Sequence, residues 1–337
     1  MNQTVNVAKG IAIASMVVGH VISNDTFLCI FIYKWHMPLF FFFSGYFFNV
    51  NKYSAKDFVI RKLKTIYFPF IFWSLLVLGL HNFLVRLNIN PSPIFDIHGY
   101  KVLVYRIVFE LRQYEPLLGT FWFLSQLLMV NLLAYVLFIG LKGKTRHIYY
   151  ELAMLVVCSI ASLILCKYHC VLYYNVSYIT FLALACFICG KLLRNIRLSN
   201  SYVLILAVLV VSSSKWNFQE MIAIDYTQII PYYITAVGGI IIIYNLSLFI
   251  AKSVLIGKVF SYLGKKSLSI MILHFAGFKL VSFLVIKVWG LPIDNMAEHP
   301  VIHGLSFPWQ MLYIMIGIGM PLMLEVIYNR IKMFING

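Results

Sequence analysis

Long apolar segments follow one another along most of the chain, and they constrain its fold more than any other feature. The hydrocarbon core of a bilayer is about 30 Å thick, so a helix needs roughly 20 apolar residues to cross it. We expect about ten spanning helices, near residues 5–24, 27–48, 65–85, 119–140, 150–168, 172–193, 199–214, 229–250, 267–288 and 306–328. The predicted fold is an all-α integral membrane protein, a single domain over residues 1–337.

Composition agrees with this fold and excludes an ordinary soluble domain. Hydrophobic residues make up 62% of the chain and charged residues only 11%, with a mean hydropathy of +0.88. The net charge of +16 does not indicate a nucleic-acid partner, because the basic residues lie in short loops between apolar segments.

The loops differ in charge in a way that predicts the topology. Those after the second, fourth, sixth and eighth segments, with the C-terminal tail, hold Lys52, Lys56, Arg61, Lys62, Lys64, Lys142, Lys144, Arg146, Lys191, Arg194, Arg197, Lys252, Lys258, Lys265, Lys266, Arg330 and Lys332. Because basic loops stay in the cytoplasm, both termini are expected there. The predicted location is the inner (cytoplasmic) membrane, crossed several times.

The connection 86–118 is then an outward loop. Its part from Tyr100 to Glu115 is amphipathic, which is typical of a helix that lies in the interface or re-enters the bundle.

The six cysteines are interpreted as small apolar residues. Cys166 with Cys170, and Cys186 with Cys189, have a spacing loosely like that of metal ligands, but they lie in or beside apolar segments. We expect no metal site.

Three ionisable residues in the first two apolar segments are the strongest functional signal. Lys9 and His20 lie in the first segment and His36 in the second. Ionisable groups at membrane depth are costly unless they face a cavity or a partner. On a helix, Lys9 and His20 are eleven residues apart, which is three turns, so both share a face about 16 Å apart along the axis. Pro38 is expected to interrupt the second helix where a cavity opens.

These segments resemble the acyltransferase 3 family of integral membrane enzymes, which acylate hydroxyl groups of sugars and related acceptors. The family's basic residue, ten residues and histidine match Lys9 and His20, and its second motif matches residues 35–46, Trp-His-Met-Pro-Leu-Phe-Phe-Phe-Phe-Ser-Gly-Tyr. Many members have arginine where this chain has Lys9, and lysine lacks arginine's bidentate fork. Further similar motifs occur at 61–69, 119–124 and 263–274.

The resemblance implies a catalytic group and a donor site. His20 is expected to act as general base on the acceptor hydroxyl or as a transient acyl carrier, with His36 beside it. Lys9 either contacts the donor or anchors the cytoplasmic end of the helix. Arg61, Lys62 and Lys64 are expected to bind the phosphates of acyl-CoA, or only to set topology.

Two residues of the later motifs are candidates for the substrate site. They are Trp122, which is also typical of an interfacial aromatic belt, and His274, expected two turns inside the ninth span. Five outer polar residues are weaker candidates for contact with an acceptor sugar, because such residues are common in exposed loops: His98, Asp294, Glu298, His299 and His303.

The leading hypothesis is an O-acyltransferase that moves an acetyl or other short acyl group from acetyl-CoA, or another acyl-CoA, to a hydroxyl of a cell-surface glycan or lipid-linked sugar. The expected partners are the donor, the glycan acceptor and the bilayer, with no bound cofactor and no nucleic acid. The competing hypotheses are a polysaccharide exporter, flippase or polymerase, and a membrane receptor or scaffold without turnover.

Overall fold

The chain folds into a bundle of helices, and the computed structural model describes residues 3–142, 148–195, 200–213 and 220–336. No strand occurs in these ranges. The α-helices are α1 (Gln3–Gly19), α2 (Phe27–Tyr46), α3 (Ala55–Lys62), α4 (Phe68–Arg86), α5 (Ile97–Glu110), α6 (Trp122–Ile139), α7 (Ile148–Lys167), α8 (Tyr178–Leu192), α9 (Asn200–Ser213), α10 (Ile229–Ile250), α11 (Val254–Lys265), α12 (Ser267–Trp289) and α13 (Phe307–Asn336). A π-helix, η1 (Leu63–Tyr67), joins α3 to α4, and five short 3-10 turns are η2 (Pro116–Phe121), η3 (Tyr173–Asn175), η4 (Leu193–Asn195), η5 (Tyr226–Gln228) and η6 (Ile293–Ala297).

Eight helical segments of the described residues are long and apolar enough to cross a membrane. They are Phe27–Tyr46, Ala55–Arg86, Pro116–Ile139, Ile148–Lys167, Tyr173–Leu192, Tyr226–Ile250, Ser267–Trp289 and Phe307–Met333. The protein is therefore a multi-pass membrane protein. The other two expected spans are the helices α1, of 17 residues, and α9, of 14 residues. Both are shorter than the roughly 20 residues of a typical spanning helix.

The expected interruption at Pro38 is wrong, because α2 continues through this residue. Proline removes one backbone N–H and leaves the carbonyl four residues earlier without its usual donor. Here the residues from Lys34 to Leu39 are all buried, so packing on both sides holds the helix together. Among the basic loop residues, Lys144, Arg146 and Arg197 lie outside the described ranges.

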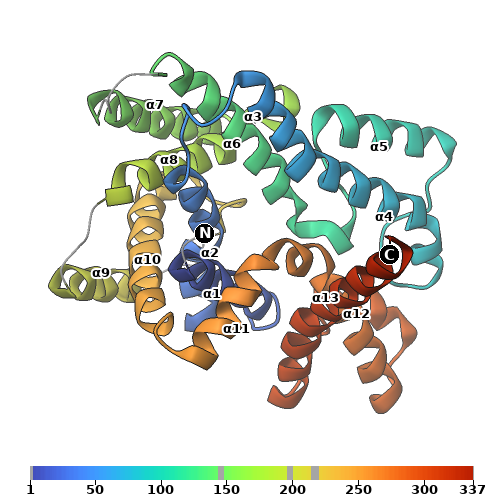
Figure 1. The fold of residues 1–337 in the computed structure, drawn as a ribbon. Helices are drawn as coiled ribbons and strands as arrows, with labels where there is room; N and C mark the ends of the chain where they lie inside the picture. The colour runs from blue at the N-terminus through green and yellow to red at the C-terminus, as the bar shows by residue number, and fades with distance from the viewer. Residues whose placement is uncertain (1–2, 143–147, 196–199, 214–219, 337) are drawn as a thin grey trace.

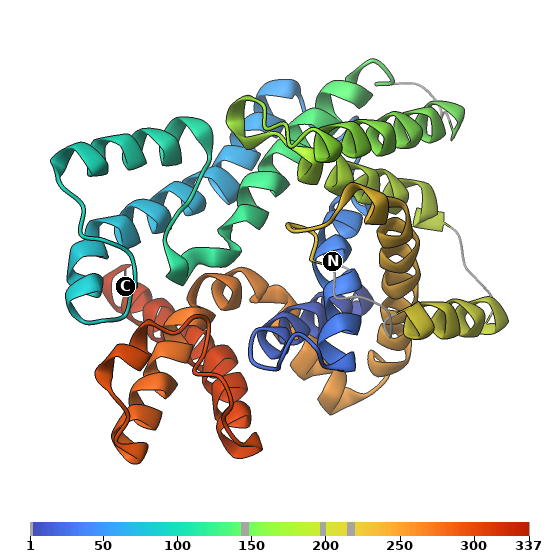
Figure 2. The ribbon, with the colours of Figure 1, turned by 180° about the vertical axis from the view of Figure 1, so that it is seen from behind.

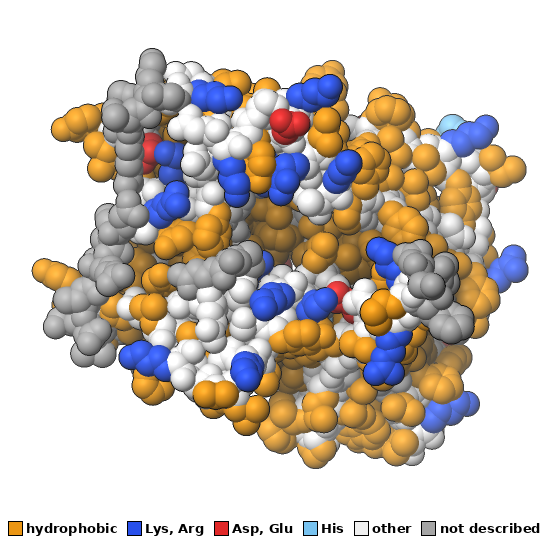
Figure 3. Space-filling model, viewed as in Figure 1, with side chains coloured by type: hydrophobic (Ala, Val, Ile, Leu, Met, Phe, Trp, Pro, Cys, Tyr) orange, Lys and Arg blue, Asp and Glu red, His pale blue; other side chains and the backbone are white. Residues whose placement is uncertain are grey.

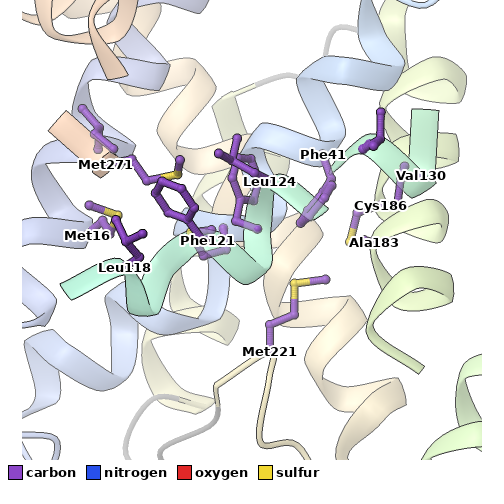
Figure 4. Close-up of a cluster of buried hydrophobic side chains, with 14 of the residues drawn as sticks. Met16, Phe41, Leu118, Phe121, Leu124, Val130, Ala183, Cys186, Met221 and Met271 are labelled. Atoms are coloured by element: carbon purple, nitrogen blue, oxygen red, sulfur yellow. The ribbon is translucent and has the colours of Figure 1, made fainter. Parts of the chain in front are cut away.

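Helices α1 and α2 lie inside the bundle. Helices α8 and α10 pack on one side of them and the α12–α13 pair on the other (Figure 1, Figure 2). The buried core between these helices is largely aliphatic and aromatic. Figure 4 shows Met16, Phe41, Phe121 and Leu124, which come from different helices, within it.

Two glycine crossings fix the positions of α1 and α2. A Cβ added to Gly10 of α1 would lie 1.9 Å from the carbonyl oxygen of Phe260 in α11, and one added to Gly45 of α2 would lie 1.8 Å from that of Phe187 in α8. Gly264 of α11 and Gly190 of α8 are equally close to α1 and α2 in return. Small residues allow this close backbone approach between membrane helices.

A buried polar cluster holds the connection between α4 and α6. Nδ1 of His81 lies 2.8 Å from Oε1 of Glu115, and Asn90 donates to the other carboxylate oxygen at 2.9 Å. Nε2 of His81 donates to the carbonyl of Pro93 at 2.9 Å. The expected amphipathic helix in this loop is α5, which packs along α4. The cluster therefore fixes a long loop against the bundle at both of its ends.

Candidate active site

Regular spacing along α1 and α2 places two rows of side chains against a common space. Lys9, Ile13 and Met16 of α1, and His20 directly after the end of that helix, recur at intervals of three and four residues, which puts them on one side. All four line one of two neighbouring cavities, and the facing row on α2 begins at Tyr33 and ends at Ser44. The predicted common face of Lys9 and His20 is confirmed.

The first cavity, here called the basic cavity, has a volume of about 460 Å³. Four cationic side chains line it: Lys9, Lys52, Arg61 and Lys62. No Asp or Glu is present among its described lining residues. Figure 3 shows a hollow with an apolar floor, bordered on two sides by Lys and Arg side chains. A cavity with several cations and no acid attracts anionic groups such as phosphates.

Aromatic rings hold three of these cations in place. The guanidinium of Arg61 lies 4.6 Å from the ring centre of Tyr53, and the ammonium of Lys52 lies 5.3 Å from the same ring. The ammonium of Lys62 lies 5.3 Å from the ring centre of Phe58. Lys64 is exposed and does not line the cavity. Lys64 therefore differs from Arg61 and Lys62 of the same segment, which do line the cavity.

The second cavity, here called the histidine cavity, has a volume of about 300 Å³. His20, His36 and His299 line it, with Trp122 and Glu220. Trp122 lies at the start of α6 and offers an aromatic wall. The predicted convergence of His20 and His36 is therefore confirmed.

Hydrogen bonds set the tautomer of the neutral His36 ring and connect His20 to Tyr33. Nδ1 of His36 lies 2.8 Å from the carbonyl of Ile32. Because a carbonyl only accepts, this nitrogen carries a proton, and Nε2 of the neutral ring is left as a base. Nδ1 of His20 lies 3.2 Å from the hydroxyl of Tyr33, which can donate or accept.

His274 lies behind His20 and lines neither cavity. The two rings stack with centroids 5.5 Å apart. Nδ1 of His274 donates to the carbonyl of Met271 at 2.9 Å, and its Nε2 has no hydrogen-bond partner among the described residues. This arrangement supports the ring of His20 from the side away from the cavity.

His299 comes from the loop between α12 and α13. Its ring centre lies 4.7 Å from that of Phe275, which also contacts His20. The ammonium of Lys279 donates to the carbonyls of Met296 and Glu298, and so holds this loop against α12. Burial, and to a smaller extent the charge of Lys279, lower the pKa of His299 from 6.5 to about 4. His299 is therefore neutral at physiological pH.

Sequence reasoning identified part of the site. It named Lys9, Arg61 and Lys62 in the basic cavity, and His20, His36 and Trp122 in the histidine cavity. It passed over Tyr33, Glu220 and the pair Met16 and Met37, and it treated His299 as a weak candidate. Burial raises the pKa of Glu220, yet an acid in a loop gives no sequence signal of that kind.

The lining residues contain no set that forms a metal centre. Among the described residues, no group of three or more His, Cys, Asp or Glu side chains is arranged to hold a metal ion.

Comparison with known proteins identifies the family of the chain. The model of a family described as an acyltransferase domain, the acyltransferase 3 family, matches residues 2–324. No curated protein and no solved structure matches the chain.

Proposed function

The chain belongs to the acyltransferase 3 family and is a membrane acyltransferase, and we propose from this premise that it transfers an acetyl or other short acyl group from acyl-CoA to a hydroxyl. The proposed acceptor is a cell-surface glycan or a lipid-linked sugar precursor. One observation carries the proposal: a cavity lined by four cations adjoins a cavity lined by three histidines.

In this proposal the phosphates of CoA lie in the basic cavity, near Lys52, Arg61 and Lys62. Charge-assisted hydrogen bonds from these side chains are the usual way in which proteins bind phosphate. The thioester then extends along α1 toward His20. Polar side chains of the same cavity, Ser44 and Asn131, are bonded to each other at 3.1 Å and offer partners for the amides of the donor's arm.

The reaction takes place in the histidine cavity. Nε2 of His20 takes the proton of the acceptor hydroxyl, and the oxygen attacks the thioester carbonyl. The new C–O bond forms, the C–S bond breaks, and the CoA thiolate takes the proton back from His20. For this role Nδ1 of His20 keeps its proton and donates a hydrogen bond to the oxygen of Tyr33. Trp122 supplies an apolar face against which a sugar ring can pack.

The proposal also fixes an orientation. We propose ten spans, with α1 and α9 crossing as short helices, and both termini in the cytoplasm. The basic cavity then opens to the cytoplasm of the cell, where acyl-CoA is found, and the protein lies in the inner membrane.

The test is acyl transfer in membranes. Membranes with the unmodified protein or with His20→Ala are incubated with radiolabelled acetyl-CoA, and lipid-linked and polymeric glycans are extracted. Label that requires the unmodified protein supports the proposal, provided that the variant is folded and present at the same level. Full transfer by a folded His20→Ala variant would show that the assigned mechanism is wrong. Absence of label with acetyl-CoA and with succinyl-CoA favours a transport protein.

A further inference from the structure

Met16 and Met37 are the described residues that line both cavities. Met16 of α1 lies four residues before His20, and Met37 directly follows His36 on α2. Both are buried, with 2% and 6% of their surface exposed. These two side chains therefore form the boundary that the two cavities share.

We propose that Met16 and Met37 form the constriction that selects which acyl groups reach the histidines. The inference rests on the proposed function, because it concerns the donor of that reaction. With CoA phosphates at the basic cavity and the reacting carbonyl at His20, the acyl group passes between the two methionines. The bulk and branching of that group then decide how easily it passes.

Methionine suits such a constriction. Its side chain is unbranched, has three rotatable bonds and fills irregular gaps, so it moves aside for a slim group at small cost. A branched or wide acyl group requires more displacement within a densely packed interior. Figure 4 shows Met16 close to other core side chains, with Met271, Leu118 and Phe121 around it, which leaves little room for a larger movement. The constriction therefore favours small linear acyl groups over branched ones.

Two other methionines provide matched controls. Met271 lines only the basic cavity and Met221 only the histidine cavity. Their exposed fractions, 4% and 3%, are like those of the junction pair. Replacing any of the four by alanine removes the same atoms from a buried site. Only the two junction variants widen the passage.

The experiment compares acyl-CoA donors of increasing bulk on purified protein in detergent with the acceptor glycan fraction. Acetyl-, propionyl-, isobutyryl- and benzoyl-CoA are used, and the rate with each donor is divided by the acetyl rate of the same variant. Met16→Ala and Met37→Ala are expected to raise the isobutyryl and benzoyl ratios about tenfold or more, in line with the usual effect of a few methylene groups in a pocket. Met16→Leu and Met37→Leu keep most of the volume and are expected to retain the ratios of the unmodified protein.

Each outcome supports or overturns the inference. A rise confined to the junction variants supports it. An equal rise in Met221→Ala shows that the volume of the histidine cavity sets the choice, and unchanged ratios in all four alanine variants show that no methionine does. Either result overturns the inference while leaving acyl transfer intact. If the unmodified protein transfers no acyl group from any donor, the proposed function itself fails, and the inference with it. The melting temperature of each variant shows whether it is folded. If one of the two junction variants is unfolded, the donor ratios of the other junction variant test the inference.

Discussion

Replacement of Lys62 by glutamine is the sharpest test of the basic cavity. Lys62 lines the cavity and is half-buried, with its ammonium against Phe58. A hydrogen bond to a charged group contributes about 1.5–3 kcal/mol when it is sheltered from water. At about 1.4 kcal/mol per tenfold change, removal of one phosphate contact raises the Kd for CoA by about 10- to 100-fold.

The matched control lies two residues further along the same basic run. Lys64→Gln removes the same charge from the same segment, but Lys64 is exposed and lines neither cavity. Its loss changes only the general field of the protein, which salt screens over about 8 Å at physiological ionic strength. The Kd of this variant is expected to stay within about twofold of the unmodified protein.

The assay is isothermal titration calorimetry of CoA into purified protein at two salt concentrations. Added salt should weaken binding to the unmodified protein more than to Lys62→Gln, because one ionic contact is already missing in that variant. Equal weakening by Lys62→Gln and Lys64→Gln refutes the reasoning, because net charge and not the cavity would then control affinity. No change in either variant shows that the phosphates bind elsewhere.

Three other expectations follow from the described contacts. Tyr33→Phe removes the hydroxyl that orients the imidazole of His20. The kcat should therefore fall about tenfold while the KM for acyl-CoA stays unchanged. An equal change in both constants contradicts this role of Tyr33. Gly45→Val should prevent folding, because its Cβ meets a backbone carbonyl, whereas Gly79→Val, which meets nothing within 4 Å, should not; the yield of monodisperse protein in detergent measures this, and equal yields contradict it. The pKa of His299 is lowered on folding, so the unfolded chain binds a proton more readily below pH 6.5; stability should therefore fall as pH falls from about 6.5 to about 4, and His299→Gln should remove part of that fall. Melting temperatures across this range test it, and parallel curves for the two proteins refute it.

The sequence predicts the parts of the site that one helix contains. Lys9 and His20 share a face because helical periodicity alone places residues eleven apart three turns along one side. The same periodicity accounts for Met16 between them, but nothing in a single sequence shows that Met16 and Met37 line the same two cavities. Contacts between helices depend on packing, and the hydrogen bond of His20 to Tyr33 is of this kind.

Loops and helix ends are where sequence reasoning loses information. His299 reaches the histidine cavity only because Lys279 holds its loop against α12, and no local pattern distinguishes it from the exposed His303. The length of α1 was overestimated for a related reason. Hydrophobicity continues through Val21 and Ile22, whereas the helix ends at Gly19, because the chain turns there toward the start of α2.

The glycine crossings determine which walls of the passage can move. Gly10 and Gly45 line neither cavity, and through them α1 and α2 are fastened to α11 and α8 with no space for sliding. Another wall of the basic cavity includes Thr65 and Ile66 of η1, a π-helix, and π-helical turns are frequent at functional sites. Under the proposed function, we therefore expect release of a spent donor to involve movement of the segment from α3 to α4. We expect α1 and α2 to keep their alignment from one turnover to the next, because their glycine contacts leave no space for sliding.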